Sequence, residues 1–566
     1  MNNSVDKIPG FGGVIGTESF DTQTAISGTE MIFDSNNLKL FVSGNSSCGL
    51  QKFHVSDNQF IWTGGLSLGM DFQLNEFDYY KADHKFIYVT FIDSGLQIYT
   101  DHYSKMPLLY LYENETLYFA TSMELLLQVA GRQSTKFNVE GLLFYYNFGF
   151  TSFNHTLING VKSLSGGQVL KFNNGKINIE TYFNVFDVTN YIASSKPLES
   201  HVNSIDTYLL QSTRNVLESN QNIGIALSGG VDSGYLAQKI NECGKSFNAY
   251  TIGFKDDYNE FERVDYLSKK LNFTTKKIIL KPEDIITNYL EVSKHSSFPV
   301  GFNNSILNFI YKEASQDGVD IMFDGDGADR LFLGMNKYLQ LQKILKLYTS
   351  IKSVNGHKIF ASILKLVLHP TASKLRFYFL KFNNDFPFYG ERKLSDSSVY
   401  DIHFEKLLND LALPKELKKL SDSIDKWLFF SIFSVYYTPT FFFHTPYELQ
   451  LKHNIVSNPQ FWSDDLVTLA LQIPTDQKLR GNTTKVVLRE AAKIKIDDGY
   501  WNLSKIGLQN SYSYIKRSKQ GKVFVADYIS VVKKSEEYKL LDETMPYKIV
   551  DAERLIPYVI WKEYNK

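Results

Sequence analysis

The stretch "IALSGGVDSGYLA", residues 225–237, joins an apolar run to a short segment of serine, glycine and aspartate. The run 222–227, "NIGIAL", is short and rich in β-branched residues, which predicts a buried parallel strand. The segment 234–244, "GYLAQKINECG", has helical spacing and ends on a glycine. A strand, a glycine turn and a helix N-terminus form a cradle for anions, because free N–H groups and the helix dipole both favour negative charge. The stretch therefore predicts a phosphate site.

This cradle matches neither of the two common nucleotide loops, since it lacks the Lys-Ser/Thr of the Walker A loop and the third glycine of the dinucleotide fingerprint. It resembles instead the SGGxDS loop of the ATP pyrophosphatases, which split ATP between the α and β phosphates. The resemblance implies that the loop holds pyrophosphate and that its acid helps to hold Mg²⁺; the matching residues are Ser228, Gly229, Gly230, Asp232 and Ser233. An ordinary glycine-rich turn is the alternative for so short a motif.

A second acidic loop follows another apolar run in "GVDIMFDGDGADRLFLG", residues 318–334. Open α/β sheets bind ligands at the carboxyl ends of their strands, so we expect the two loops to meet there. Asp232 and Asp329 are then placed to share a magnesium ion, because Mg²⁺ takes one or two carboxylates together with substrate phosphates. A calcium-binding turn is the alternative, and the missing remaining ligands of an EF-hand loop weigh against it.

With both loops in hand, the chain resembles the asparagine synthetase family over most of its length. "YTIGF" (250–254), "DGDGAD" (324–329) and "NTTKVVLREAAK" (482–493) match segments of its synthetase half in the family's order. Upstream, "TDHYSKMPLLYLYENETLYFATS" (100–122) and "TLINGVKSLSGGQVLKFNNGKINIETYF" (156–183) resemble its amidotransferase half.

The resemblance assigns further roles. The backbone at Leu227 and Ile252 holds adenine, and Asp324 and Gly325 contact ATP at the second loop. Asp326 takes the place of a glutamate that lies near the reacting carboxylate and steers or deprotonates the amine.

Two basic residues complete this reading of the site. Lys505, in "NLSKIGL", matches a lysine that stabilises charge on the acyl-adenylate, and a solvated surface lysine is its alternative. Arg330 replaces the usual glutamate after Asp329, which argues against ordinary asparagine synthesis.

The organisation of the chain agrees with two domains. Short β-rich runs with turn signals fill the first part, and strands alternate with helices beyond "VTNYIASSKPLES" (188–200). We predict a degenerate class II glutamine amidotransferase-like domain over 1–190, built as an Ntn-hydrolase-like sandwich of antiparallel sheets. We predict an asparagine synthetase-like ATP-pyrophosphatase domain over 200–566, an α/β domain with a doubly wound parallel sheet and added helices.

Composition restricts the class of protein. The 566 residues carry a net charge of -1, with 43% hydrophobic and 21% charged residues, typical of a globular protein rather than a basic nucleic-acid binder. Two cysteines, Cys48 and Cys243, are too few for a disulfide framework, and "MNNSVDKIPG" has no signal-peptide pattern, so we expect a cytoplasmic protein. The apolar segment 427–444 contains Pro439 and is expected to be a buried helix rather than a membrane span.

The amidotransferase half departs from the family where glutamine is hydrolysed. The family begins with a catalytic cysteine whose free amino group takes part, whereas residue 2 is Asn2 and "GFGGVIG" (10–16) has Gly12 at the cysteine position. Cys48 cannot supply a terminal amine and is expected to be a plain loop cysteine. The family's FASE segment is replaced by "FATS" (119–122). We interpret this half as a structural relic without glutaminase activity.

Three hypotheses follow for the function. The first is an amide ligase that uses ATP and Mg²⁺ on a carboxylate substrate and an organic amine, as in the lasso-peptide cyclases and β-lactam synthetases that resemble this family. Its most plausible substrate is a short precursor peptide, processed with a protease and closed into a macrolactam. The second is an asparagine synthetase using free ammonia, and the third a non-catalytic ATP-binding relic. None involves nucleic acid or a membrane.

Overall fold

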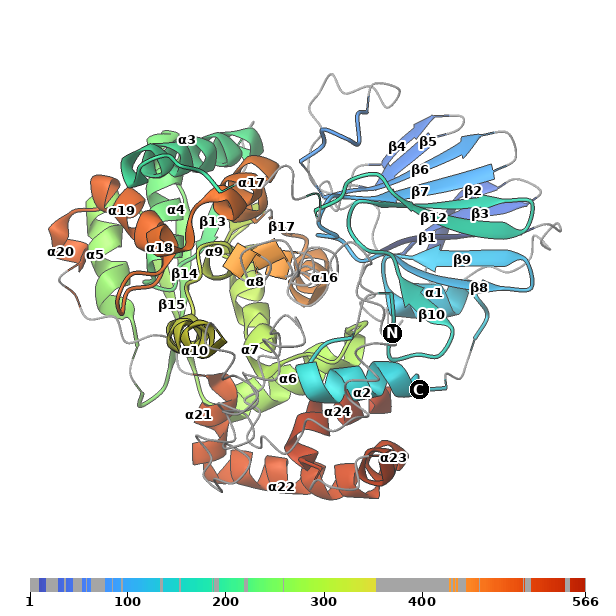
Figure 1. Cartoon of the computed structure of the whole chain (residues 1–566). Coiled ribbons are helices and arrows are strands. Elements are labelled where there is room, and N and C mark those ends of the chain that lie inside the picture. The colour runs from blue at the N-terminus through green and yellow to red at the C-terminus, as the bar shows by residue number, and fades with distance from the viewer. Residues whose placement is uncertain are drawn as a thin grey trace.

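The computed structural model describes most of the chain (Figure 1). The described residues are 10–16, 29–34, 37–43, 53–56, 59–62, 77–83, 85–92, 95–132, 136–151, 154–185, 187, 193–217, 222–257, 259–352, 427–428, 431–432, 434–435, 444–457, 459–501, 503, 510–544 and 550–564.

The N-terminal half is a sandwich of two six-stranded antiparallel sheets. One sheet has the order β10-β8-β9-β1-β3-β2 and the other β12-β11-β7-β6-β5-β4. The strands are β1 Gly10–Ile15, β2 Thr29–Asp34, β3 Leu38–Ser43, β4 Phe53–Ser56, β5 Gln59–Trp62, β6 Ile87–Ile92, β7 Gly95–Thr100, β8 Leu109–Glu113, β9 Thr116–Ala120, β10 Val161–Ser163, β11 Gln168–Asn173 and β12 Lys176–Thr181. The expected antiparallel sandwich is confirmed.

The C-terminal half contains a five-stranded parallel sheet of order β15-β14-β13-β16-β17. Its strands are β13 Ile223–Ala226, β14 Asn248–Phe254, β15 Thr274–Leu280, β16 Ile321–Phe323 and β17 Val456–Ser457. The chain starts in the middle, winds to one edge and then returns to build the other, which is the doubly wound arrangement expected from the sequence. The loops after β13 and β16 therefore meet where the winding reverses.

Helices cover both faces of this sheet (Figure 1). One apolar core joins β13 to α3, α4, α5, α17 and α19, and the other joins β14 to α6, α8, α22 and α24. The helices of the first core are α3 Leu198–Val216, α4 Val231–Glu242, α5 Phe261–Leu271, α17 Asp464–Gln472 and α19 Val486–Lys495. The remaining helices are α1 Met123–Val129, α2 Val139–Phe148, α6 Pro282–His295, α7 Phe302–Ser305, α8 Leu307–Gln316, α9 Ala328–Leu331, α10 Asn336–Lys352, α16 His444–Lys452, η4 Gln460–Trp462, α18 Thr475–Lys478, α20 Asp498–Trp501, α21 Ser511–Arg517, α22 Lys519–Lys534, α23 Glu536–Thr544, η5 Ala552–Leu555 and α24 Ile556–Tyr564.

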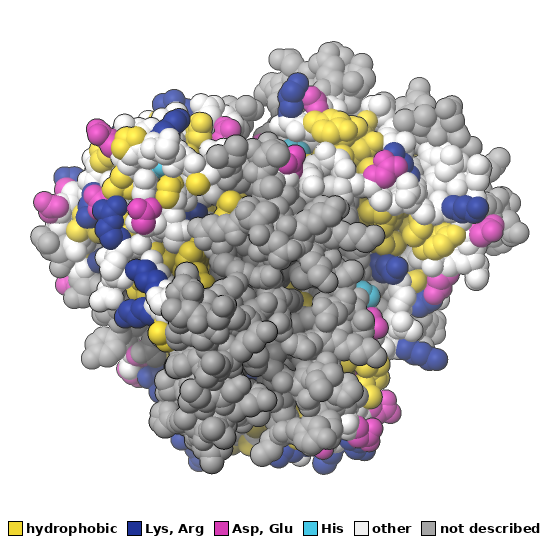
Figure 2. Space-filling model, viewed as in Figure 1, with side chains coloured by type: hydrophobic (Ala, Val, Ile, Leu, Met, Phe, Trp, Pro, Cys, Tyr) yellow, Lys and Arg dark blue, Asp and Glu magenta, His cyan; other side chains and the backbone are white. Residues whose placement is uncertain are grey.

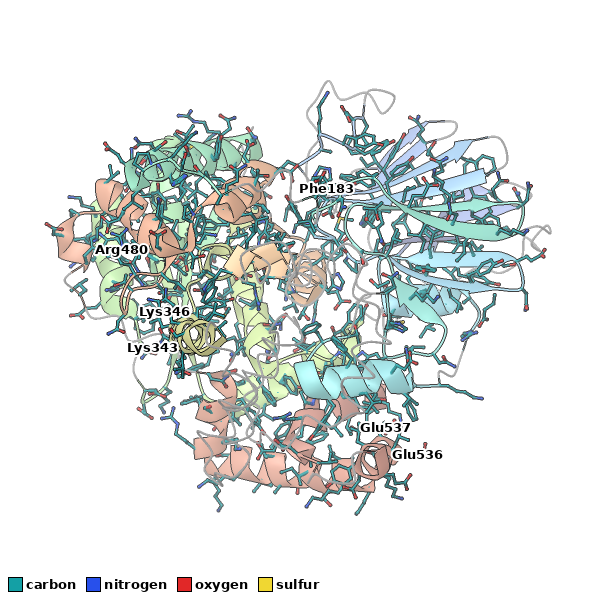
Figure 3. The ribbon with its side chains drawn as sticks, in the orientation of Figure 1. Phe183, Lys343, Lys346, Arg480, Glu536 and Glu537 are labelled. Carbon is teal, nitrogen blue, oxygen red and sulfur yellow. The ribbon has the colours of Figure 1, made fainter. Side chains whose placement is uncertain are left out.

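The two halves share an extensive contact. The ring of His102 stacks on Phe183, with centroids 4.0 Å apart, and its Nδ1 lies 2.8 Å from Oδ2 of Asp464 at the start of α17. Phe183 lies where the sandwich faces the α/β half (Figure 3). Tyr447 of α16 is buried in the sandwich core and accepts a 2.9 Å hydrogen bond from Trp62 Nε1. The sandwich and the parallel sheet are thus joined by packing and by polar contacts.

Between the halves, β12 ends at Thr181 and α3 begins at Leu198. The domain bounds 1–190 and 200–566 remain a prediction. No helix among the described residues is long and apolar enough to cross a membrane. Of the apolar segment 427–444, most residues lie outside the described part, while Trp427, Ile432 and Val435 are buried. On the described surface, charges of both signs are interspersed with polar and apolar patches (Figure 2).

Candidate active site

The strand, glycine turn and helix that the sequence predicts are formed by β13, residues 227–230 and α4. Gly229 has φ +70°, in the left-handed region that glycine tolerates best, and its carbonyl accepts a 2.8 Å hydrogen bond from the Tyr500 hydroxyl. The Ser233 hydroxyl accepts from the Ser228 N–H at 3.1 Å, and the Ser228 hydroxyl accepts from the Gly230 N–H at 3.2 Å. These internal bonds hold the loop open in front of a twelve-residue helix, whose dipole favours an anion.

The second loop lies directly against the first. A side chain added at Gly325 would place its Cβ 3.1 Å from both Asp232 Cβ and the Ser233 nitrogen, so a larger residue would require the first loop to move by a few tenths of an ångström. Gly327 has φ +102° and packs against the indole of Trp462. The structure therefore brings together the two motifs, which are far apart in sequence.

Lys485 joins the two loops and was not identified by sequence reasoning. Its Nζ lies 2.5 Å from Oδ2 of Asp232 and 2.6 Å from Oδ1 of Asp329, and its side chain is 3% exposed. Burial disfavours its charge, but the two carboxylates more than compensate and raise the pKa of Lys485. It precedes α19 in "NTTKVVLREAAK" and has φ +53°, a conformation that ordinary side chains seldom adopt. The sequence signal for Lys485 is a basic residue directly before a helix. Its position in the sequence does not show where the lysine side chain points.

The carboxylates of Asp232 and Asp329 both contact the Lys485 ammonium, so they lie side by side. Two neighbouring carboxylates are a donor set that fits a single Mg²⁺ whose other ligands are substrate phosphates. Among the described residues, no group of three or more His, Cys, Asp or Glu converges to form a metal site made by protein alone. A magnesium that depends on substrate for its remaining ligands is consistent with both observations.

Asp324 and Asp326 form the acidic part of the second loop. Oδ2 of Asp324 accepts a 2.8 Å hydrogen bond from the Ser457 hydroxyl, and Oδ1 accepts from the Asp326 N–H at 3.0 Å. Asp326 keeps solvent-exposed surface, but protein atoms pack around its carboxyl. The resulting desolvation is the main influence that raises its pKa to about 8, and the charges of Asp324 and Asp329 act in the same direction. A carboxylate with this pKa is a stronger base than an ordinary aspartate.

Arg330 follows Asp329 in the second loop and lies in α9. The structure buries Arg330 to 6% exposure, and its charge acts to lower the pKa of Asp326. It therefore belongs to the electrostatic surroundings of the acidic loop.

The structure places most predicted site residues around this junction. Leu227 follows β13 and donates its N–H to the Tyr250 carbonyl at 2.9 Å, which sets its backbone beside that of Ile252 in β14. Lys505 lies outside the described residues, as do Asn2 and Cys48. Their predicted roles stay predictions.

In the amidotransferase-like half, the cysteine position of the family motif lies inside a strand. Gly12 belongs to β1 and pairs with Phe41 on one side and Ala120 on the other. A Cβ at Gly12 would lie 2.7 Å from the Phe119 carbonyl oxygen and 2.9 Å from Ala120 Cβ. A side chain has no room there without displacement of backbone.

Comparison with protein families gives two matches, "Asparagine synthase" over residues 204–555 and "Glutamine amidotransferase domain" over residues 85–183. The chain belongs to the asparagine synthase family. A curated relative, asparagine synthetase [glutamine-hydrolyzing] 1 of Bacillus subtilis, is 24% identical over 430 residues, which cover 72% of this chain. The match spans 64% of the length of that relative.

Solved structures with local similarity include an NH3-dependent NAD synthetase from Campylobacter jejuni, 14% identical, covering 35% of this chain and 100% of that chain, with a TM-score of 0.20. Another is the NMN synthetase from Francisella tularensis, 16% identical, covering 24% of this chain and 58% of that chain, with a TM-score of 0.19. Similarities with TM-scores this low do not assign a fold. The fold of this asparagine synthase family member is assigned from its own strand order.

Proposed function

We propose that this protein forms an amide bond from a carboxylate and an amine, using ATP and releasing AMP and pyrophosphate. The observation that carries the proposal is the close packing of the two loops, with Gly325 against Asp232 and Ser233 and with Lys485 joining Asp232 to Asp329. In the first step, a carboxylate oxygen attacks the α-phosphorus of ATP and pyrophosphate leaves. In the second, the amine attacks the acyl carbon and AMP leaves, while the amine proton passes to a base.

The chain's own groups are assigned to these steps as follows. The Ser228–Ser233 loop and the α4 N-terminus bind the pyrophosphate part of ATP. Asp324 and Gly325 hold the nucleotide, and Lys485 offsets negative charge between the loops. Mg²⁺, held by Asp232 and Asp329, would neutralise phosphate charge when bound. Asp326, with its raised pKa, accepts the amine proton.

We further propose that glutamine is not the nitrogen source. The strand position of Gly12, which leaves no space for a side chain, supports this absence of glutaminase chemistry. An amine that is part of an organic substrate, most plausibly the N-terminus of a precursor peptide with an Asp or Glu side chain to activate, is the preferred nucleophile. Intramolecular attack has a high effective molarity and so outruns hydrolysis of the adenylate.

The test incubates the purified protein with ATP, Mg²⁺ and a synthetic peptide that has a free N-terminus and an Asp or Glu side chain, and follows both the nucleotide products and the peptide mass. AMP, pyrophosphate and a peptide lighter by one water support macrolactam formation. Phosphate and ADP would refute adenylation, and efficient conversion of aspartate and ammonium to asparagine would indicate the ammonia-dependent synthetase. Asp232→Asn should be inactive, whereas Asp265→Asn, on the outer side of α5 in an exposed pair with Lys277, is the matched control.

A further inference from the structure

A buried lysine of the N-terminal half lies close to the acidic loop of the other half. Lys85 precedes β6 and is 3% exposed. Its Nζ donates a 3.1 Å hydrogen bond to Oε1 of Gln450, which belongs to α16. The Lys85 ammonium is thus anchored across the contact between the halves, far along the chain from its partner.

From Gln450 a line of buried polar side chains continues to the second loop. Nε2 of Gln450 donates to the Tyr311 hydroxyl at 3.1 Å, and the Ser457 side chain lies next to the Tyr311 phenol, where it acts to lower the pKa of Tyr311. The Ser457 hydroxyl donates to Oδ2 of Asp324 at 2.8 Å. The line begins at an ammonium and ends at a carboxylate.

The chemistry of the groups at each end fixes the direction of their bonds. An ammonium can only donate, so Gln450 must turn its oxygen to Lys85 and its NH₂ to Tyr311. At the other end, the Ser457 hydroxyl donates its one proton to Asp324 and can only accept from a further partner. Buried hydrogen bonds in a network polarise and strengthen one another.

The electrostatics of the two ends are reciprocal. Burial lowers the pKa of Lys85 to about 8, and the charge of Asp324 is the first influence that opposes this shift. Burial raises the pKa of Asp324, and the charge of Lys85 is among the influences that oppose it. Asp101 also favours the Lys85 ammonium, while Lys105 disfavours it.

We propose that Lys85 is a positioning residue of the synthetase site, which orients the Asp324 carboxylate through Gln450, Tyr311 and Ser457. The amidotransferase-like half then contributes to nucleotide binding without touching the nucleotide. This inference rests on the proposed role of Asp324 in holding ATP. It predicts that removal of Lys85 weakens ATP binding even though the residue lies in the other half.

The test measures the affinity for ATP in the presence of Mg²⁺ by isothermal titration calorimetry, together with KM for ATP and kcat of pyrophosphate release. Lys85→Met and Ser457→Ala should each weaken ATP binding about tenfold, mainly through KM, because each interrupts a chain of hydrogen bonds to a charged group. The ATP affinity of the double variant should lie within about twofold of that of either single variant, because both changes act through one network.

Lys171→Met is the control, since Lys171 lies in the same half, forms an exposed pair with Glu180 and lies outside the line. It should keep ATP affinity within about twofold of the natural protein. Losses that multiply in the double variant, or unchanged ATP affinity in folded Ser457→Ala, would overturn the proposal. If ATP binds and Lys85→Met weakens it while no substrate releases pyrophosphate, the positioning role stands and the proposed reaction fails.

Discussion

The Nζ atom of Lys485 lies 2.5 Å from Oδ2 of Asp232, so a residue that precedes α19 is the direct partner of the Ser228–Ser233 loop. The same ammonium contacts Asp329. Without Lys485, two carboxylates would face each other with no fixed positive charge, which disfavours a bound polyphosphate.

We therefore expect Lys485→Met to reduce pyrophosphate release about 100-fold, comparable to the loss of one preorganised electrostatic contact. Lys485→Arg should fail to restore it, because the guanidinium is larger and Gly334 packs directly against the Lys485 stem. The measurement is the initial rate of pyrophosphate release at saturating ATP. Lys493→Met, in an exposed pair at the far end of α19, is the control and should be active. Full activity of Lys485→Met would contradict the assignment.

Gly334 provides an independent probe of the same ammonium. A Cβ at this position would lie 1.8 Å from Cε of Lys485 and 2.0 Å from Oδ1 of Asp329, so Gly334→Ala must displace the lysine or the aspartate. We expect pyrophosphate release to fall by at least about tenfold, because a small misplacement of a charged contact is costly. Gly301→Ala, where a Cβ meets nothing within 4 Å, should leave the rate unchanged. Equal rates in the two variants would show that Lys485 and Asp329 are not held as described.

The stability of the protein should depend on pH through Glu448, a buried residue of α16. Burial raises its pKa from 4.5 to about 7, while hydrogen bonds from Ser296 and Ser297 act in the opposite direction. A carboxyl whose pKa is raised by folding makes the free energy of unfolding larger at low pH than at high pH. This contribution is fully present below about pH 4.5 and is lost as the pH rises through about 7. The cost at pH 8 is on the order of 3 kcal/mol.

Glu448→Gln removes this titration, so its apparent Tm should exceed that of the natural protein at pH 8 and match it more closely at pH 5. Thermal melts at the two pH values measure the difference. Glu199→Gln, on the exposed side of α3, should leave the pH dependence of Tm as it is. A Glu448→Gln variant whose Tm falls in parallel with the natural protein between pH 5 and 8 would exclude Glu448 as the source.

The N-terminal half should remain without glutaminase activity even when a cysteine is restored. Gly12→Cys places a side chain against the Phe119 carbonyl and Ala120, which should destabilise the protein by about 1–3 kcal/mol. Incubation with glutamine should give no glutamate above background, for this variant and for the natural protein, and Tm should fall in the variant alone. Glutamate formation that Cys48→Ala abolishes would overturn this prediction.

Local patterns in the sequence were sufficient to predict the sandwich, the parallel sheet and the meeting of the two loops, because Gly229 and Gly325 stand at strand ends where backbone must approach backbone. Lys485 and the buried position of Arg330 were missed, since long basic side chains take their direction from tertiary neighbours rather than from spacing. The line from Lys85 to Asp324 contains five residues, each in a different helix, strand or loop, and no local pattern relates them. The role of Lys505 stays a prediction.

The apolar core that covers one face of the parallel sheet also contains Leu109, Tyr145 and Val161 of the N-terminal half, packed with Ile556 and Trp561 of α24. Excision of the sandwich would expose this shared surface to water, at a cost that grows with the apolar area uncovered. The N-terminal half therefore supports the C-terminal half through this shared core, independently of any reaction with glutamine. The shared core ties retention of the N-terminal segment to the stability of its neighbour.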